Sequence, residues 1–159
     1  MLQKHKTILL IDDEAPQRAF MRRVLEDAGY NVLEGADHDE ALIAALRETP
    51  GQLGGAAVLC PTLREVDRYY RLLTKAGLQV QRLEAYDGAV TDACKIGTYH
   101  RVKGLEFKQV FLPCYDHSIR ELGQSGAAAQ EHGQLARRRL FVAITRARDH
   151  VWLGTAAAG

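Results

Sequence analysis

Nothing in this sequence provides for membrane insertion, secretion or a disulfide framework. Its three cysteines, Cys60, Cys94 and Cys114, are odd in number and widely spaced. That pattern favours reduced thiols in a cytoplasm, and it lacks the ligand spacing of a zinc finger. The apolar run from Ile8 to Ile11 is far shorter than the roughly 18 residues of a membrane span, and no signal-peptide pattern precedes it. We therefore expect a cytoplasmic protein without membrane contact.

The charge is small overall but unevenly distributed. The formal net charge is +1, and 47% of the residues are apolar, which is enough for a packed core. Residues 1–55 carry 6 basic and 10 acidic side chains, whereas residues 56–159 carry 15 and 10. A basic second part fits a nucleic-acid partner, and it fits an ordinary solvated surface as well.

The first fifty residues have the pattern of a strand, a helix, a strand and a helix. Thr7 to Ile11 is a continuous apolar run, typical of a strand buried on both faces of a parallel sheet. The helix that follows starts near Pro16 and ends at Gly29. Residues 30–33 are the next strand, and the capping box from Asp37 to Glu40 opens the second helix.

The same pattern recurs with an offset of 48 residues. A strand over Ala56 to Leu59 is followed by a capping box from Thr62 to Glu65. Tyr69 and Tyr70 fall on the apolar face of the ensuing helix with Val66 and Leu73, so we interpret them as core residues rather than as a base-stacking platform. Further elements are expected as strands over 79–83, 94–98, 110–112 and 150–153 and a helix over 135–148.

This alternation of strands and helices predicts an α/β fold. Right-handed crossovers would give a three-layer α/β/α sandwich with a mainly parallel, doubly wound sheet. The composition shows no Pro/Ser-rich linker, so we expect a single domain over residues 1–159. The segment from Gln52 to Gly55 is the only candidate joint, and it is too short to separate two cores.

The segment over residues 5–48 resembles the opening of a response-regulator receiver domain. The resemblance rests on the strings ILLIDDE (8–14), LEDAGY (25–30) and NVLEGA (31–36). It implies that Asp12 and Asp13 bind Mg²⁺, for which oxygen ligands are suited. The alternative is that they are two solvated carboxylates. The receiver's phosphate-accepting aspartate is missing, because the third strand ends at Cys60-Pro61 and no acidic residue lies between Glu48 and Glu65.

From residue 56 onward the chain resembles the second motor lobe of UvrD/Rep-like superfamily 1 helicases. The segment IGTYHRVKGLEF (96–107) resembles motif V, and LFVAITRAR (140–148) resembles motif VI. The resemblance implies single-stranded nucleic acid near Thr98 and His100, with Lys103 as a further contact. It also implies a nucleotide near Gly104 and Glu106, and an arginine finger at Arg146. These residues make weak candidate sites, because without the resemblance the arginines are a solvated helix face and Lys103 and Glu106 a surface pair.

Parts of a helicase that hydrolyse ATP are missing from these residues. No G-x-x-x-x-G-K-[ST] loop and no Walker-B acids occur, and Leu135-Ala136 replaces the acidic pair usually seen before motif VI. We therefore expect no catalytic residue, no enzyme activity and no required cofactor or partner. The leading hypothesis is an engineered or fused chimera, a hybrid of flavodoxin-like and P-loop/RecA-like folds. The alternatives are a module that binds phosphate, nucleotide or single-stranded DNA, and a receiver-like Mg²⁺-binding signalling domain.

Overall fold

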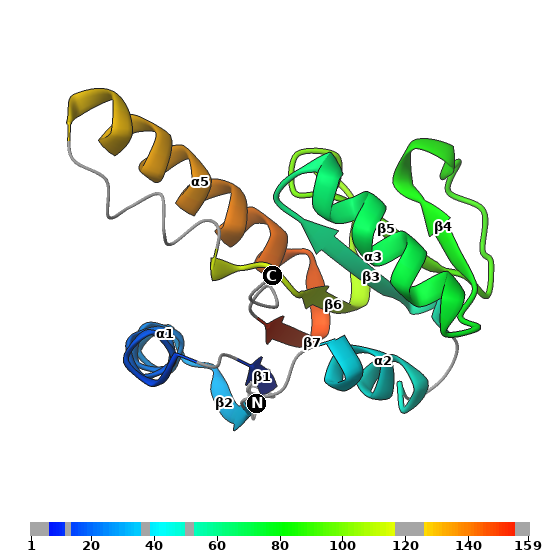
Figure 1. Ribbon diagram of the computed structural model, residues 1–159, viewed down its shortest axis with the longest axis horizontal. Helices are drawn as coiled ribbons and strands as arrows, with labels where there is room; N and C mark the ends of the chain where they lie inside the picture. The colour runs from blue at the N-terminus through cyan, green and yellow to red at the C-terminus, as the bar shows by residue number, and fades with distance from the viewer. Residues whose placement is uncertain (1–6, 12–13, 36–38, 50–52, 117–125, 155–159) are drawn as a thin grey trace, which may run out of the picture.

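The strands form one parallel sheet in the computed structural model, which describes residues 7–11, 14–35, 39–49, 53–116 and 126–154 (Figure 1). The sheet has seven strands in the order β2-β1-β7-β6-β3-β5-β4, and each neighbouring pair is parallel. The strands are β1 (Thr7–Ile11), β2 (Asn31–Gly35), β3 (Ala56–Cys60), β4 (Val80–Arg82), β5 (Cys94–Thr98), β6 (Phe107–Leu112) and β7 (Ala147–Gly154). The fold class is therefore confirmed as α/β with a parallel sheet flanked by helices.

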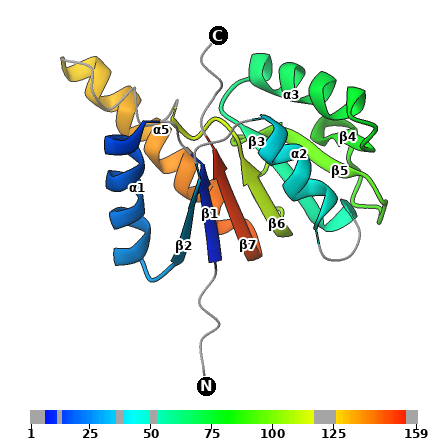
Figure 2. The same ribbon diagram turned by 60° about the horizontal axis from the view of Figure 1, so that its bottom comes forward.

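Among the residues that the structure describes, four helices cover the two faces of this sheet (Figure 2). They are α1 (Ala15–Asp27), α2 (Asp39–Arg47), α3 (Leu63–Lys75) and α5 (Ala127–Thr145), and two short 3-10 turns are η1 (Leu53–Gly55) and η2 (Leu83–Ala85). Helices α1 and α5 each connect a strand to one that lies nearer the β2 edge of the sheet. Helices α2 and α3 each connect a strand to one that lies nearer the β4 edge. Because crossovers share one hand, the two pairs lie on opposite faces.

Each face carries its own hydrophobic cluster. Strand β3 is buried along its whole length, and successive side chains point to opposite faces. Ala57 and Leu59 pack in the cluster under α1 and α5, whereas Val58 and Cys60 pack in the cluster under α2 and α3. Both clusters contain residues from before and after residue 50.

The expected repeat is present in local structure but not in topology. Helices α1 and α3 are both 13 residues long and end in glycines with positive φ, Gly29 at 89° and Gly77 at 83°. However, α1 joins two adjacent strands, whereas β5 lies between the two strands that α3 joins. The helices also cover opposite faces. The repeated sequence pattern therefore gives two helices of equal length, whereas the strands that they pack against determine which face of the sheet each helix covers.

Several expected boundaries differ from the structure. Strand β6 starts at Phe107 and β7 at Ala147, earlier than expected, and helix α5 begins at Ala127 instead of residue 135. Ala147 is the first residue of β7 and not part of the helix. Tyr69 is buried as expected, whereas Tyr70 is only partly buried beneath the Arg82 guanidinium.

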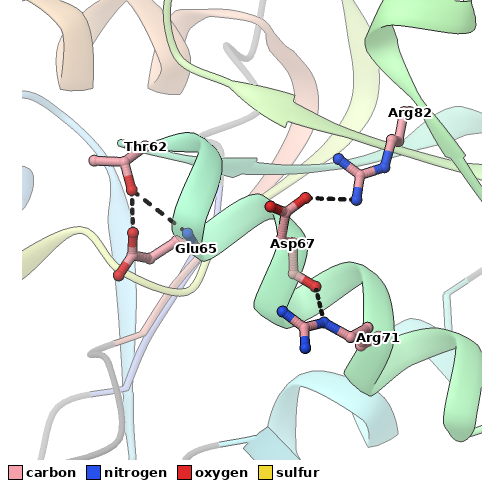
Figure 3. A network of polar contacts seen from close by, with 5 residues as sticks. All are labelled: Thr62, Glu65, Asp67, Arg71 and Arg82. Atoms are coloured by element: carbon pink, nitrogen blue, oxygen red, sulfur yellow. Dashed lines mark hydrogen bonds and ion pairs between the residues drawn. The ribbon is translucent and has the colours of Figure 1, made fainter.

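The capping box at the start of α3 is confirmed. The backbone N–H of Glu65 donates to the Thr62 hydroxyl, and the Glu65 carboxylate accepts from the same hydroxyl (Figure 3). One turn further, the Asp67 carboxylate accepts a hydrogen bond of 2.6 Å from Arg82 of β4. The other expected box starts at Asp37, which lies outside the described residues.

The segment expected as a candidate joint is packed tightly. A Cβ atom on Gly54 would lie 1.9 Å from the carbonyl oxygen of Thr91, so only glycine fits there. Nearby, the Lys95 ammonium donates to the Thr91 hydroxyl at 2.8 Å and to the Ala93 carbonyl at 2.8 Å, with the Gly54 carbonyl at 3.5 Å. These contacts attach the start of β3 to the connection between β4 and β5.

Candidate functional site

The motif V segment starts at the end of the sheet where the strands terminate, called here the carboxyl end. Thr98 is the last residue of β5, and its neighbour on β3 is Cys60. The backbone N–H of Tyr99 donates to the Cys60 carbonyl at 3.0 Å, and the Arg101 N–H donates back to the Thr98 carbonyl at 3.1 Å. This turn leaves Thr98 partly exposed and His100 fully exposed.

A buried cluster of thiols and phenols lies beneath this turn. Burial raises the pKa of the Cys60 thiol well above its usual value, and a hydrogen bond with the Cys114 thiol raises it further. Burial also raises the pKa of the Tyr69 and Tyr99 hydroxyls. Protonated, inaccessible thiols are poor nucleophiles and poor metal ligands. The cluster therefore supports the turn and offers no reactive group.

The carboxyl end also contains the topological switch point of the sheet. Strand β3 continues into α3 on one face, and its neighbour β6 leads to α5 on the other face. Open α/β sheets bind ligands in the crevice between such strands. Here Cys60, Cys114 and Tyr115 are fully buried at that point. Side chains therefore fill the position at which related folds hold a ligand.

The rest of motif V reaches the opposite, amino end of the sheet. The Leu105 N–H donates to the Val102 carbonyl in a turn in which Gly104 has a φ of 84°. A side chain is strained at this φ. Gly104 and Glu106 are both exposed. The turn thus presents open backbone and one carboxylate at the amino end.

Motif VI meets motif V at this amino end. The Phe107 N–H donates to the Arg146 carbonyl at 2.9 Å, which joins the start of β6 to the end of α5. The Arg146 guanidinium is folded back on its own helix, donating to the Val142 carbonyl and the Thr145 hydroxyl, each at 3.3 Å. A cation at this place is favoured by the negative end of the helix dipole.

The structure therefore divides the predicted residues into two groups. Thr98 and His100 lie at the carboxyl end, whereas Gly104, Glu106 and Arg146 lie at the amino end. Lys103 lies in the connection between them. It is exposed, and within the described ranges it forms no ion pair with Glu106.

No described cavity encloses either group. A shallow cleft of about 330 Å³ is lined by Leu53, residues 77–79 and Asp92. It lies beside η1 and the starts of β4 and β5, and it touches none of the predicted residues.

Sequence reasoning missed two polar residues. Lys95 is almost fully buried, and burial lowers the pKa of its ammonium group. Its position inside a strand, next to apolar residues, was the signal that could have singled it out. Arg68 of α3 pairs with Asp39 of α2 at 2.7 Å and so joins the first fifty residues to the rest. No pattern within either helix predicts that pair.

The predicted magnesium ligands Asp12 and Asp13 lie outside the described residues. Over the ranges that the structure describes, no three His, Cys, Asp or Glu residues are grouped to hold a metal ion. Within the same ranges, no helix is long and apolar enough to cross a membrane.

The fold and the paired motifs define a lobe of the helicase type. A family model for the UvrD-like helicase C-terminal domain matches residues 56–158, and the chain belongs to that family. Its fold resembles the crystal structure of the C-terminal domain of a possible DNA helicase from Lactobacillus plantarum WCFS1, with a TM-score of 0.51 at 15% identity. That likeness covers 98% of this chain and 76% of the other. No curated protein sequence matches significantly.

The receiver and chimera hypotheses receive no support from these findings. The structural likeness includes almost all of the first fifty residues. In a flavodoxin-like sheet the third strand lies beside the first, whereas here β7 and β6 lie between β1 and β3. The local strings that resemble a receiver therefore form a different sheet.

Proposed function

We propose that this chain is a binding module of helicase type, which contacts single-stranded DNA at the carboxyl end of its sheet and a nucleotide at the amino end. The observation that carries the proposal is the distribution of the two motifs. One continuous segment, residues 96–107, reaches both ends of the sheet, and its last residue is hydrogen-bonded to Arg146. Contacts at one end can thereby be transmitted to the other.

At the carboxyl end, Thr98 supplies a hydroxyl and His100 an imidazole, both accessible to solvent. Arg101 is exposed next to them and adds a positive charge. Hydroxyls and cations of this kind bind phosphate oxygens and fix the register of a strand without reading its sequence. We therefore expect binding that depends strongly on salt and weakly on base sequence.

At the amino end, the chain supplies only part of a nucleotide site. The planar guanidinium of Arg146 is suited to bidentate phosphate contacts, and the open backbone at Gly104 permits close approach. An arginine finger stabilises the charge of a phosphoryl group that other residues hold. The 159 residues contain no phosphate loop, so ATP hydrolysis requires residues from elsewhere, and we propose that the isolated chain is not an enzyme.

The test is fluorescence anisotropy of a labelled single-stranded oligonucleotide at low salt. At low salt we expect a Kd below the range of about 10⁻⁴ to 10⁻⁶ M that is typical of backbone binding at physiological salt. The double variant Thr98→Ala/His100→Ala should bind several-fold more weakly. Thr74→Ala/His150→Ala is the matched control, because it removes the same groups from exposed positions on α3 and β7. Absence of binding at the lowest salt, or equal losses in both variants, would refute the proposal.

Phosphate release from ATP tests the second part. We expect no turnover above background by the isolated chain, with or without oligonucleotide. Turnover that the Arg146→Ala variant abolishes would show instead that the chain contains a complete catalytic site.

A further inference from the structure

The first two-thirds of helix α5 have little contact with the rest of the molecule. Figures 1 and 2 both show the start of this helix projecting away from the sheet. Among residues 127–139, only Gly133 is buried. Ala129 and Ala136 are partly buried on the same face of the helix as Gly133, and the remaining faces of these residues are exposed. We call residues 127–139 the α5 arm.

The outer surface of α5 combines apolar and basic side chains. Leu135 is 44% exposed and Val142 is 38% exposed. Arg138 stands three residues after Leu135 and four residues before Val142, so the three side chains share one face of the helix. The resulting stripe is apolar, cationic and apolar in turn.

This surface carries an uncompensated positive charge. Helix α5 contains three consecutive arginines, Arg137 to Arg139, and a single acidic residue, Glu131. The Arg137 guanidinium stacks 5.6 Å from the centre of the Phe141 ring. Arg138 and Arg139 are exposed, and neither makes an ion pair or hydrogen bond with another described residue. Two guanidinium groups are therefore available to an anionic partner.

The start of the arm lies at the same end of the sheet as Thr98 and His100, whereas Arg138 stands eight residues, about 12 Å of helix, before Arg146 and so lies between the two ends. Helix α5 follows β6 and precedes β7, two parallel neighbours, so it runs from the carboxyl end back to the amino end. Its start is thus at the carboxyl end, and Arg146 at its other terminus is at the amino end. A nucleic acid that contacts Thr98 and His100 has the arm on the same side of the molecule.

We propose that the α5 arm is a docking surface for the phosphate backbone of double-stranded DNA, with Arg138 and Arg139 as the contacting residues. The inference rests on the proposed function, because it adds a second surface to the same nucleic-acid partner. Charge complementarity identifies a polyanion as the occupant. Leu135 and Val142 then pack against the sugar carbons on either side of the contacted phosphates.

Charge density favours a duplex over a single strand at this surface. A duplex presents its backbone with about one charge per 1.7 Å of axis, about twice the density of either strand alone. Single strands are held by a basic groove together with aromatic rings on which bases stack. Phe141 of α5 is partly buried beneath Arg137, and the exposed His132 stands six residues before Arg138. Arg138 and Arg139 therefore offer phosphate contacts without an adjacent exposed ring, whereas His100 stands beside Thr98 at the single-strand site.

The test compares duplex and single-stranded oligonucleotides on the full chain and on Arg138→Gln/Arg139→Gln. For the duplex, the slope of log K against log salt should become shallower by about 1.8 when two phosphate contacts are lost. Single-strand affinity should change by less than two-fold. Arg23→Gln/Lys75→Gln is the control of equal charge, because both residues are exposed on other helices. It should leave the duplex slope unchanged.

Two results would overturn the proposal. One is an unchanged duplex slope in the arm variant, which includes the case in which the wild-type chain binds no duplex. The other is an equal loss in the control, which would indicate attraction by net charge alone. Far-UV circular dichroism of each variant verifies folding. Failure of the proposed function is a separate outcome, because it appears as missing single-strand binding or as insensitivity to Thr98→Ala/His100→Ala.

Discussion

The two ends of the sheet differ in how their candidate residues are supported. At the carboxyl end, Thr98 and His100 stand on a filled and buried layer that includes Tyr99 and Cys60. At the amino end, Gly104 and Glu106 are exposed, and the hydrogen bonds of the Arg146 guanidinium go to its own helix. Under the proposed function, a strand of DNA needs only the residues of the carboxyl end, whereas a nucleotide at the amino end needs further residues from a second lobe.

The largest expected effect concerns the packing at the carboxyl end. Tyr99 is 3% exposed within the hydrophobic cluster beneath α5. Tyr99→Ala should lower the free energy of unfolding by about 3 to 5 kcal/mol, as for other large aromatic truncations. Its hydroxyl makes no hydrogen bond with a described residue, so Tyr99→Phe should cost less than about 1 kcal/mol. Urea denaturation measures both, and similar costs for the two variants would contradict this account of the buried layer.

The next effect concerns the junction at the amino end. Gly54→Ala places a methyl group against the backbone of Thr91, which cannot move cheaply, and should cost about 1 to 3 kcal/mol. At Gly55 the added atom meets only flexible methylenes of Lys108, the nearest at 3.3 Å. Gly55→Ala should therefore cost less, as judged by the shift in the thermal midpoint. If the first variant were as stable as the second, the junction would be looser than described.

A smaller effect concerns the pH dependence of stability, to which two buried groups at the start of β5 contribute. Burial raises the pKa of Cys94, at the start of β5, to about 12. The unfolded chain therefore loses this proton first, and stability falls as pH rises above 9.0. The expected slope is about 1.4 kcal/mol per pH unit for this group. Unfolding of wild type and Cys94→Ala between pH 8 and pH 10.5 measures it, and the variant should show the shallower decline.

Lys95 contributes with the opposite sign. Its lowered pKa means that the folded protein releases the proton before the unfolded chain does, so its contribution to stability increases as pH rises toward 10.5. In Lys95→Met the alkaline loss should therefore be steeper than in wild type. Equal slopes in wild type, Cys94→Ala and Lys95→Met would show that neither group titrates as the structure implies.

The smallest expected effect concerns the surface pair Arg68–Asp39, which joins α3 to α2. Both side chains are partly exposed, at 41% and 27%. A double-mutant cycle to alanine should give a coupling of about 0.2 to 1 kcal/mol, reduced by salt. A coupling above about 2 kcal/mol would mean that this ion pair, rather than the shared clusters, holds the first fifty residues in place.

The sequence predicts local elements better than their neighbours in space. Thr62 and Glu65 fix the start of α3 because the cap is satisfied by adjacent residues, and Gly77 fixes its end. The insertion of β7 between β1 and β6 depends on contacts between residues more than 130 positions apart, for example Leu9 and Trp152. No periodicity encodes such a pairing. The order of the strands in the sheet could therefore not be predicted from the sequence alone.

The candidate site shows the same limit. The candidate residues could be predicted because each resemblance rests on a continuous string, residues 96–107 and residues 140–148. The candidate residues lie at opposite ends of the sheet because residues 99–106 run from its carboxyl end to its amino end. The sequence of this segment does not reveal that path. The early start of α5 was missed because the buried face of its arm consists of small residues, Ala129, Gly133 and Ala136, which do not stand out as an apolar stripe.

The most direct test of the central claim, that the two ends are separate surfaces, is single-strand anisotropy of Arg146→Ala beside Thr98→Ala/His100→Ala at one low salt concentration. The account predicts that the carboxyl-end variant loses several-fold in affinity and that Arg146→Ala stays within two-fold of wild type. If Arg146→Ala weakened the oligonucleotide as much as the other variant, the strand would cross both ends and the division would be wrong.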